Sequence, residues 1–421
     1  MSTITRRNFI AASGLAAGGI VTLAGARFAF AAPGSPNTGD AIVILMLRGG
    51  ADGLSLAPPY DYPSYQQLRP TTRILPPGNN GGALPLTGAS SGNTAVFPTG
   101  IEGVLGLHPA LQPIHDTLWK AGRLAVMPSM GIPQSESSTR SHFSAQKYLE
   151  KGSASNQVGG GWLGRMLNVA NPPGLVRGYN KGQRSLALNG GRGVVSARNL
   201  DGFTLGEFEN AGRARAALET LSSGADSVSA EGRIALDVVS TFEPLDTGLR
   251  SGYPNNGLGR SFSEVATVLK ANVGCHAAII DSGGWDMHNG LGATGDTDGN
   301  FWRRTREVGQ ALRAFADDTN QLEEITVLVV TEFGRTINEN GNQGTDHGRA
   351  STFLAMGAGI QGGVFGDDFQ DTIEDGPRGD MEVLTDYRKM LSEVVRKRGG
   401  VTNLDVVFPT YTQAGELGVV R

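Results

Sequence analysis

AIVILML, at residues 41–47, is a continuous apolar run of strand length, and the glycine-rich polar segment RGGADG follows it at residues 48–53. A strand that is apolar at every position buries both of its faces, which is typical of the interior of a parallel sheet. The polar segment then begins where such a strand ends. In sheets of this kind, binding sites form just beyond the carboxyl ends of the strands.

Further apolar runs of strand length lie on either side of helical patterns along the chain. Strands are predicted at 124–127, 277–281, 325–330 and 352–356, and helices at 107–122, 139–151, 205–245, 261–272, 298–320 and 383–398. Strands that alternate with helices predict an α/β fold with a mostly parallel, doubly wound sheet and helices on both faces. Residues 71–100 are predicted to form a long loop, and residues 153–260 an insertion or cap.

The amino-terminal residues have the three parts of a twin-arginine signal peptide. The pair Arg6-Arg7 precedes a mildly apolar stretch at 9–26, and Ala29-Phe30-Ala31 is a small-x-small cleavage site. We expect residues 1–31 to be removed and 32–421 to form one domain, exported folded by the twin-arginine translocation machinery to the periplasm or the exterior. Retention as a membrane anchor is the alternative, but the stretch is richer in Gly, Ala and Ser than a spanning helix.

Composition excludes other classes of protein. The net charge is −4 and acids and bases are mixed along the chain, so a nucleic-acid-binding surface is not indicated. There is no second long apolar run, and we expect no membrane span in the mature chain. The single cysteine, Cys275, cannot form an internal disulfide, and its apolar neighbours predict a buried structural thiol.

Oxygen and nitrogen donors lie at the ends of the predicted strands, after the strands at 41–47, 277–281 and 325–330 and just before the strand at 352–356. They are Asp52, Asp286, His288, Glu332, Asp346 and His347. If the strands are parallel, these side chains converge at one edge of the sheet. Such a mixed set suits zinc, manganese, iron, magnesium or calcium, and it predicts a divalent metal site. The alternative is that these residues cap helices and satisfy loop backbone groups without a metal.

The segment SSTRSHF, at residues 137–143, lies at the start of a predicted helix. Its hydroxyl residues Ser138, Thr139 and Ser141 are candidate nucleophiles, or ordinary helix caps. Arg140 could hold a phosphate or sulfate group together with the helix start, and His142 could activate a hydroxyl or support the helix end.

Several of these segments resemble one bacterial family, called domain of unknown function 1501. The resemblance rests on LRGGADGL (47–54), RSHF (140–143), GWLGR (161–165), GGWDMH (283–288), TEFGRT (331–336) and GTDHG (344–348). They occur in the family's order and span most of the chain.

That family is similar to a branch of the alkaline-phosphatase superfamily. The resemblance implies an α/β sheet with one or two metal ions at the strand ends and a Ser or Thr nucleophile at a helix start. Asp52, Asp286 and His288 match metal ligands of the superfamily, as do Asp346 and His347. Phe333 stands where many members have a ligand histidine.

Three functions remain open from the sequence. The leading expectation is an exported metal-dependent hydrolase of phosphate or sulfate esters that uses a hydroxyl nucleophile or metal-bound water on a small anionic substrate. A non-catalytic exported binding or assembly protein is the alternative, and Phe333 favours it. A transferase or mutase that passes a phosphoryl-like group to a carbohydrate is the third.

Overall fold

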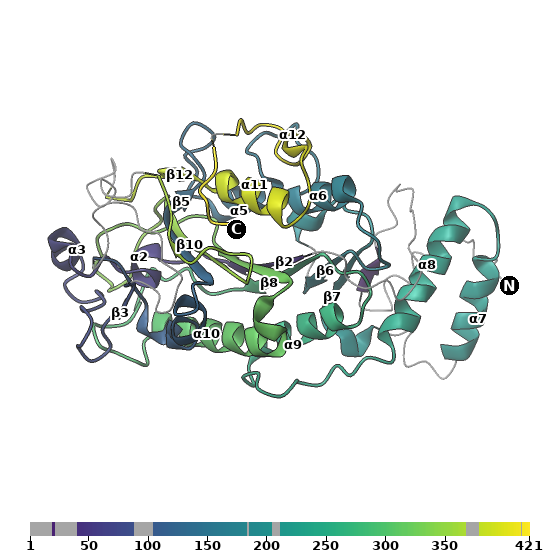
Figure 1. Cartoon of the computed structure of the whole chain (residues 1–421), viewed down its shortest axis with the longest axis horizontal. Coiled ribbons are helices and arrows are strands. Elements are labelled where there is room, and N and C mark those ends of the chain that lie inside the picture. Colours follow the sequence, from purple (N-terminus) through teal and green to yellow (C-terminus); the bar gives the residue numbers. More distant parts are fainter. Residues whose placement is uncertain are drawn as a thin grey trace.

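The computed structural model describes residues 19–21, 40–87, 104–182, 185–203, 211–367, 379–413 and 415–421. These residues form an α/β fold around one large sheet, with strand order β1-β7-β6-β8-β2-β9-β10-β5-β11 and with β12 beside β5 (Figure 1). A separate two-stranded sheet pairs β3 (Leu84–Pro85) with β4 (Gly106–Leu107).

The apolar run that follows Asp40 is the central strand β2 (Ala41–Leu47), and every residue in it is buried. It pairs in parallel with β8 (Ala277–Ser282) on one side and with β9 (Ile325–Val330) on the other. Beyond β8 the parallel order continues through β6 (Gly178–Lys181) and β7 (Val194–Ala197).

Two strands oppose this parallel order. β10 (Ser351–Met356) runs antiparallel between β9 and β5 (Leu124–Gly131), and β1 (Gly19–Val21) runs antiparallel to β7 at the far edge. The short strands β11 (Gly363–Val364) and β12 (Thr385–Asp386) pair in parallel with β5. The sheet is therefore mixed but mostly parallel, as the sequence predicts.

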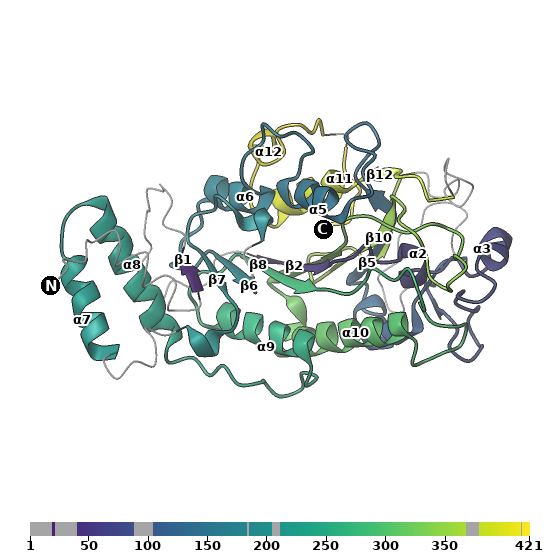
Figure 2. The ribbon, with the colours of Figure 1, turned by 180° about the vertical axis from the view of Figure 1, so that it is seen from behind.

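Helices cover both faces of the sheet, as Figures 1 and 2 show from opposite sides. One face carries α5 (His142–Lys151), α6 (Trp162–Ala170), α11 (Tyr387–Lys397) and α12 (Leu404–Val407), and the other carries α9 (Gly257–Lys270) and α10 (Asn300–Asp318). Alternate residues of β2 pack into two separate apolar cores. Ile44 lies in the core under α6 and α11, and Val43 lies in the core under α9 and α10. This alternation confirms the doubly wound arrangement, because each side of the sheet has a core of its own.

The range 153–260, expected to be an insertion or cap, contributes to the main sheet. Strands β6 and β7 lie within this range. β6 pairs with β8 and β7 pairs with β6, and Tyr179 of β6 and Val195 of β7 are buried in the same core as Phe262 of α9. Among the described residues of this range, the helical pair α7 (Ala211–Leu221) and α8 (Ser227–Phe242) projects from the end of the sheet (Figure 1).

The predicted helix at 107–122 is instead broken into η1 (Pro109–Leu111), α4 (Gln112–Ile114) and η2 (His115–Trp119). Two prolines explain the break, because each lacks the N–H that a continuous helix needs. The predicted loop at 71–100 contains strand β3, and residues 88–100 lie outside the described part of the chain. Two further short helices, α2 (Gly53–Leu56) and α3 (Pro63–Leu68), follow β2.

Cys275 is fully buried, and burial raises the pKa of its thiol to about 12, so it is a structural residue rather than a nucleophile. Among the described residues, no helix combines the length and apolar character that a bilayer crossing requires. The predicted signal peptide at 1–31 lies outside the described residues except for the three residues of β1, and it stays a prediction.

Candidate metal centre

The site lies at the carboxyl edge of the central strands, where segments next to five elements bring their polar residues together. The segments after β2, β8 and β9 end at this edge because those three strands are parallel. β10 is antiparallel to them, so the segment that precedes it, with His347, reaches the same edge. The first residue of α5, His142, completes the site.

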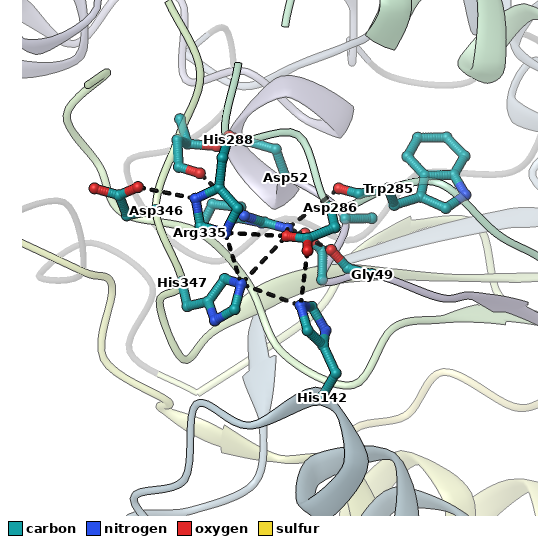
Figure 3. Close-up of polar contacts among 12 residues, drawn as sticks. Gly49, Asp52, His142, Trp285, Asp286, His288, Arg335, Asp346 and His347 are labelled. Carbon is teal, nitrogen blue, oxygen red and sulfur yellow. Dashed lines mark hydrogen bonds and ion pairs between the residues drawn. The ribbon is translucent and has the colours of Figure 1, made fainter. Parts of the chain in front are cut away.

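Three histidines and one aspartate converge there, and we call His142, Asp286, His288 and His347 the histidine–aspartate cluster (Figure 3). The Nε2 atom of His347 lies 3.1 Å from that of His142 and 2.9 Å from that of His288. Asp286 Oδ1 is 3.2 Å from His347 Nε2 and 3.1 Å from His288 Nε2, and its Oδ2 is 3.4 Å from His142 Nε2.

The other nitrogen of each imidazole, Nδ1, is held by an oxygen that can only accept a hydrogen bond. His142 Nδ1 donates to Glu332 Oε1 at 2.7 Å, and His288 Nδ1 donates to Asp346 Oδ1 at 3.0 Å. His347 Nδ1 donates to the backbone carbonyl of Arg140 at 2.9 Å. The proton of each neutral ring therefore sits on Nδ1, which leaves a lone pair on every Nε2.

Three lone pairs and a carboxylate that face one another at these distances repel. A cation bound between them, or additional protons on these atoms, would remove the repulsion. Zinc bound by nitrogen at about 2.0–2.1 Å in a tetrahedral site separates its ligand atoms by roughly 3.3 Å. The separations of 2.9–3.4 Å in the cluster fit that spacing. One ligand atom from each of His142, Asp286 and His347 lies within 4.8 Å of the other two.

Arg335 fixes the carboxylate of the cluster. Its buried guanidinium donates to Asp286 Oδ1 at 2.6 Å, to Gly50 O at 2.6 Å and to Thr345 O at 3.0 Å, and it also bonds Gly49 O. Burial acts to raise the pKa of Asp286, but the hydrogen bond from Arg335 and the positive charge of its guanidinium outweigh burial and lower the pKa to about 2. Asp286 is therefore an anion at neutral pH, as a metal ligand must be.

Glu332 is buried and supports the cluster through His142. Its Oε1 accepts from the Gly49 N–H at 2.9 Å and from Gln146 Nε2 at 3.0 Å, as well as from His142. Phe333 is the next residue after Glu332, and its ring centroid lies 4.7 Å from that of His142 and 5.0 Å from that of His347. Burial is the main reason that the pKa of His347 is lowered, which favours the neutral imidazole.

The residues expected as metal ligands divide into three groups in the structure. Asp286, His288 and His347 point their donor atoms into the cluster, whereas Glu332 and Asp346 bind the Nδ1 atoms of its histidines. Asp52 is engaged elsewhere. It accepts hydrogen bonds from the Ser55 N–H, which caps α2, and from Thr345, and it forms a buried ion pair with Arg69 at 2.9 Å.

The residues expected to act at the start of α5 have different surroundings in the structure. His142, expected as a catalytic or supporting residue, contributes its Nε2 to the cluster. The guanidinium of Arg140, expected to hold an anion, donates to the buried carboxylate of Asp380 at 2.5 Å. Thr139 Oγ1 accepts from the Ser141 N–H, and Ser138 and Ser141 are exposed.

Sequence reasoning missed the supporting residues Asp380, Arg69 and Gln146. Asp380 lies 240 residues from Arg140 along the chain, and Arg69 lies 17 residues after Asp52. The local sequence of neither residue carries a strand-end or helix-start signal. Gln146 lies one turn after His142 on α5, so the i, i+4 spacing was a usable signal.

Fold and site together define an α/β protein with histidines and carboxylates gathered at the carboxyl edge of a mostly parallel sheet. The chain belongs to the family described as "Protein of unknown function (DUF1501)", whose model matches residues 40–375. No curated protein matches the sequence significantly.

Solved structures show only distant similarity to this chain. The alkaline phosphatase from the Antarctic bacterium TAB5 is 10% identical with a TM-score of 0.31, over 78% of this chain and 95% of that one. The PsFucS1 sulfatase from Pseudoalteromonas sp. is 12% identical with a TM-score of 0.35, over 91% of this chain and 74% of that one.

Proposed function

We propose that the histidine–aspartate cluster binds a divalent cation of the zinc type and that the protein hydrolyses phosphate or sulfate esters. The observation that carries the proposal is the convergence of three imidazole Nε2 atoms and one carboxylate, with every Nδ1 held by an acceptor. Such outer hydrogen bonds fix the tautomer and the orientation of metal-binding histidines.

A bound divalent cation would polarise an ester oxygen and lower the pKa of an attacking hydroxyl or water. The chain's own residues supply the rest. Arg335 keeps Asp286 ionised and in place, and Glu332 keeps the Nε2 lone pair of His142 directed at the cluster.

Ser141 is exposed, lies directly before His142 and makes no cap bond with its side chain, so we assign it as the nucleophile ahead of Thr139. The free N–H groups at the start of α5 favour a bound anion.

Metal content tests the first half of the proposal. We expect wild-type protein, dialysed and then titrated with Zn²⁺, to retain about one equivalent by elemental mass spectrometry, and D286N and H347A to retain far less. D237N, which makes the same change at an exposed position on α8, is the control and should behave as wild type. Equal metal retention by all four proteins would refute the site.

Turnover tests the second half. The metal-loaded protein is assayed on p-nitrophenyl phosphate, bis(p-nitrophenyl) phosphate and p-nitrophenyl sulfate. We expect hydrolysis of at least one ester, abolished in D286N and strongly reduced in S141A, which keeps its metal. Metal binding without any turnover would favour the alternative class, a binding or assembly protein.

One observation favours that alternative. Arg140 and Arg335 already donate to protein oxygens, Arg140 to Asp380 and Arg335 to Asp286 and four backbone carbonyls. An anionic group would therefore depend on the cation and on the helix start for its recognition. Binding of inorganic phosphate to metal-loaded protein, without ester cleavage, is the result that this alternative predicts.

Export is the part of the proposal that rests on residues 1–31. We propose that the twin-arginine machinery carries the folded protein to the periplasm or the exterior. Replacing Arg6 and Arg7 by lysine should leave the protein in the cytoplasmic fraction, and normal export of that variant would contradict the assignment.

A further inference from the structure

Asp380 is a buried carboxylate that binds two arginines, each of which lies next to the histidine–aspartate cluster in sequence. The residue is 1% exposed, and its Oδ2 atom lies 2.5 Å from Nη2 of Arg140 and 3.4 Å from Nε of Arg349. Arg140 lies two residues before His142, and Arg349 lies two residues after His347. One carboxylate therefore joins two segments that each carry a histidine of the cluster.

The backbone of Asp380 is placed by the segment that also holds the carboxylate of the cluster. Thr336 forms an antiparallel bridge with Asp380, and the residue before it, Arg335, forms an antiparallel bridge with His347. Arg335 is the buried residue whose guanidinium binds Asp286. The position of Asp380 is therefore fixed relative to the cluster by backbone pairing, before its own side chain makes any contact.

The segment before α5 depends on Asp380 for its attachment. Residues 137–141 form neither helix nor strand, and the N–H groups of Thr139 and Ser141 donate to hydroxyl groups within this same segment. Those bonds shape the segment locally but do not join it to the sheet. The ion pair between Arg140 and Asp380 makes that connection, so the side chain of Arg140 fixes where its own backbone carbonyl lies.

That carbonyl decides which nitrogen of His347 carries the proton. Nδ1 of His347 donates to the Arg140 carbonyl at 2.9 Å. A carbonyl oxygen only accepts, so the bond holds the proton of the neutral ring on Nδ1 and leaves the lone pair of Nε2 directed into the cluster. If the charge of Asp380 is removed, Arg140 loses its anchor and the carbonyl is no longer held against the ring.

We infer that Asp380 is a positioning residue of the metal centre. It holds the Arg140 carbonyl against Nδ1 of His347 and thereby keeps Nε2 of that ring available as a ligand atom. The role in metal binding rests on the proposed divalent-cation site. The tautomer of His347, in contrast, is a property of the metal-free protein, so it can be measured whether or not a metal binds.

Long-range ¹H–¹⁵N correlation spectra of metal-free, histidine-labelled protein at pH 8 test the inference, with the His347 signals assigned by comparison with H347A. D380N keeps the size of the side chain and removes its charge. We expect His347 to be protonated on Nδ1 in the wild type and to populate the Nε2-protonated ring measurably in D380N. A wild-type ring protonated on Nε2, or an unchanged tautomer in D380N, would overturn the inference, whereas a wild type that binds no metal would refute the proposed function alone.

Zn²⁺ affinity, measured by competition with a chelating dye, separates a positioning role from a purely structural one. D318N is the matched control, because Asp318 is also shared by two cationic side chains, Arg250 and Lys270, but lies at the end of α10 on the opposite face of the sheet from α5. We expect both variants to lower the free energy of unfolding and D380N alone to weaken Zn²⁺ binding, by about 10–100-fold. Equal weakening in D380N and D318N would mean that Asp380 is only structural and would overturn the inference.

A double variant tests whether Asp380 acts through Arg140. R140A removes the guanidinium but keeps the backbone carbonyl that accepts from His347. We expect R140A to weaken Zn²⁺ binding and the double variant D380N/R140A to bind Zn²⁺ as D380N does, because both changes break the same connection. Losses of affinity that add in the double variant would show that the two residues act independently and would overturn the inference.

Discussion

At the scale of single residues, His142 shows how a side chain acquires a role that its neighbours in sequence do not reveal. It is the first residue of α5, and sequence analysis expected it to serve the nucleophile or the helix end. In the structure its Nδ1 is held by the buried Glu332, and its Nε2 joins Asp286 and His347. Glu332 therefore orients the Nε2 atom of His142 toward the cluster and does not itself contribute a donor atom there.

Replacement of Glu332 by glutamine tests this support. E332Q keeps the size of the side chain but removes its charge, and we expect metal affinity to fall by about 10–100-fold, measured by competition with a chelating dye. D346N makes the corresponding change at the partner of His288. Because Asp346 is exposed and Glu332 is buried, we expect D346N to lose less metal affinity than E332Q. An equal or larger loss of affinity in D346N would contradict this expectation.

At the scale of elements, the connection between β2 and α2 positions the site through its backbone. Gly49 has φ of +121°, and its N–H donates to Glu332 while its carbonyl accepts from Arg335. A Cβ at this position would lie 2.5 Å from the backbone nitrogen of Asp286. The β2–α2 and β8–α10 connections therefore fit together only if residue 49 is glycine.

We expect G49A to lower the free energy of unfolding by at least about 1–3 kcal/mol and to weaken metal binding, because the Asp286 backbone must move. G283A is the matched control in the same pair of connections, since a Cβ there meets no atom within 4 Å. Denaturant unfolding and metal titration measure both effects. Equal unfolding free energies and equal metal affinities of G49A and G283A would show that a Cβ at residue 49 fits without displacing the Asp286 backbone.

At the scale of the whole molecule, His108 joins the segment after β4 to α10 on one face of the sheet. It is 1% exposed, its Nδ1 accepts from the Ala110 N–H at 3.1 Å, and its ring packs on Phe301 and Trp302. Burial lowers the pKa of His108 to about 3, so the ring stays neutral in the folded protein.

The unfolded chain binds this proton near pH 6.5, well above the folded pKa, so stability is full above pH 6.5 and falls as the pH drops toward 3. Between pH 7 and pH 5 we expect His108 to account for a loss of about 2 kcal/mol. Unfolding free energies of wild type and H108N across this range measure it. The variant should lack that part of the decline, and parallel pH profiles would contradict the buried neutral assignment.

The fold was largely predictable because its signals are local. The buried strands β2, β8 and β9 and the helices α9, α10 and α11 follow from apolar runs and helical spacing, and both lie within a few consecutive residues. Strands β6 and β7 were missed because each is only four residues long and their surroundings are rich in glycine.

The sequence by itself determined the class of sheet and the edge at which polar residues gather, since parallel strands bring their carboxyl ends together. Only the tertiary structure decided which of those residues face one another. Asp52 follows the central strand as the topology requires, yet Arg69 and Thr345 take up its oxygens. His347 reaches the cluster because β10 runs antiparallel. Side-chain direction and partner choice depend on contacts between segments far apart in the chain, and local sequence does not encode such contacts.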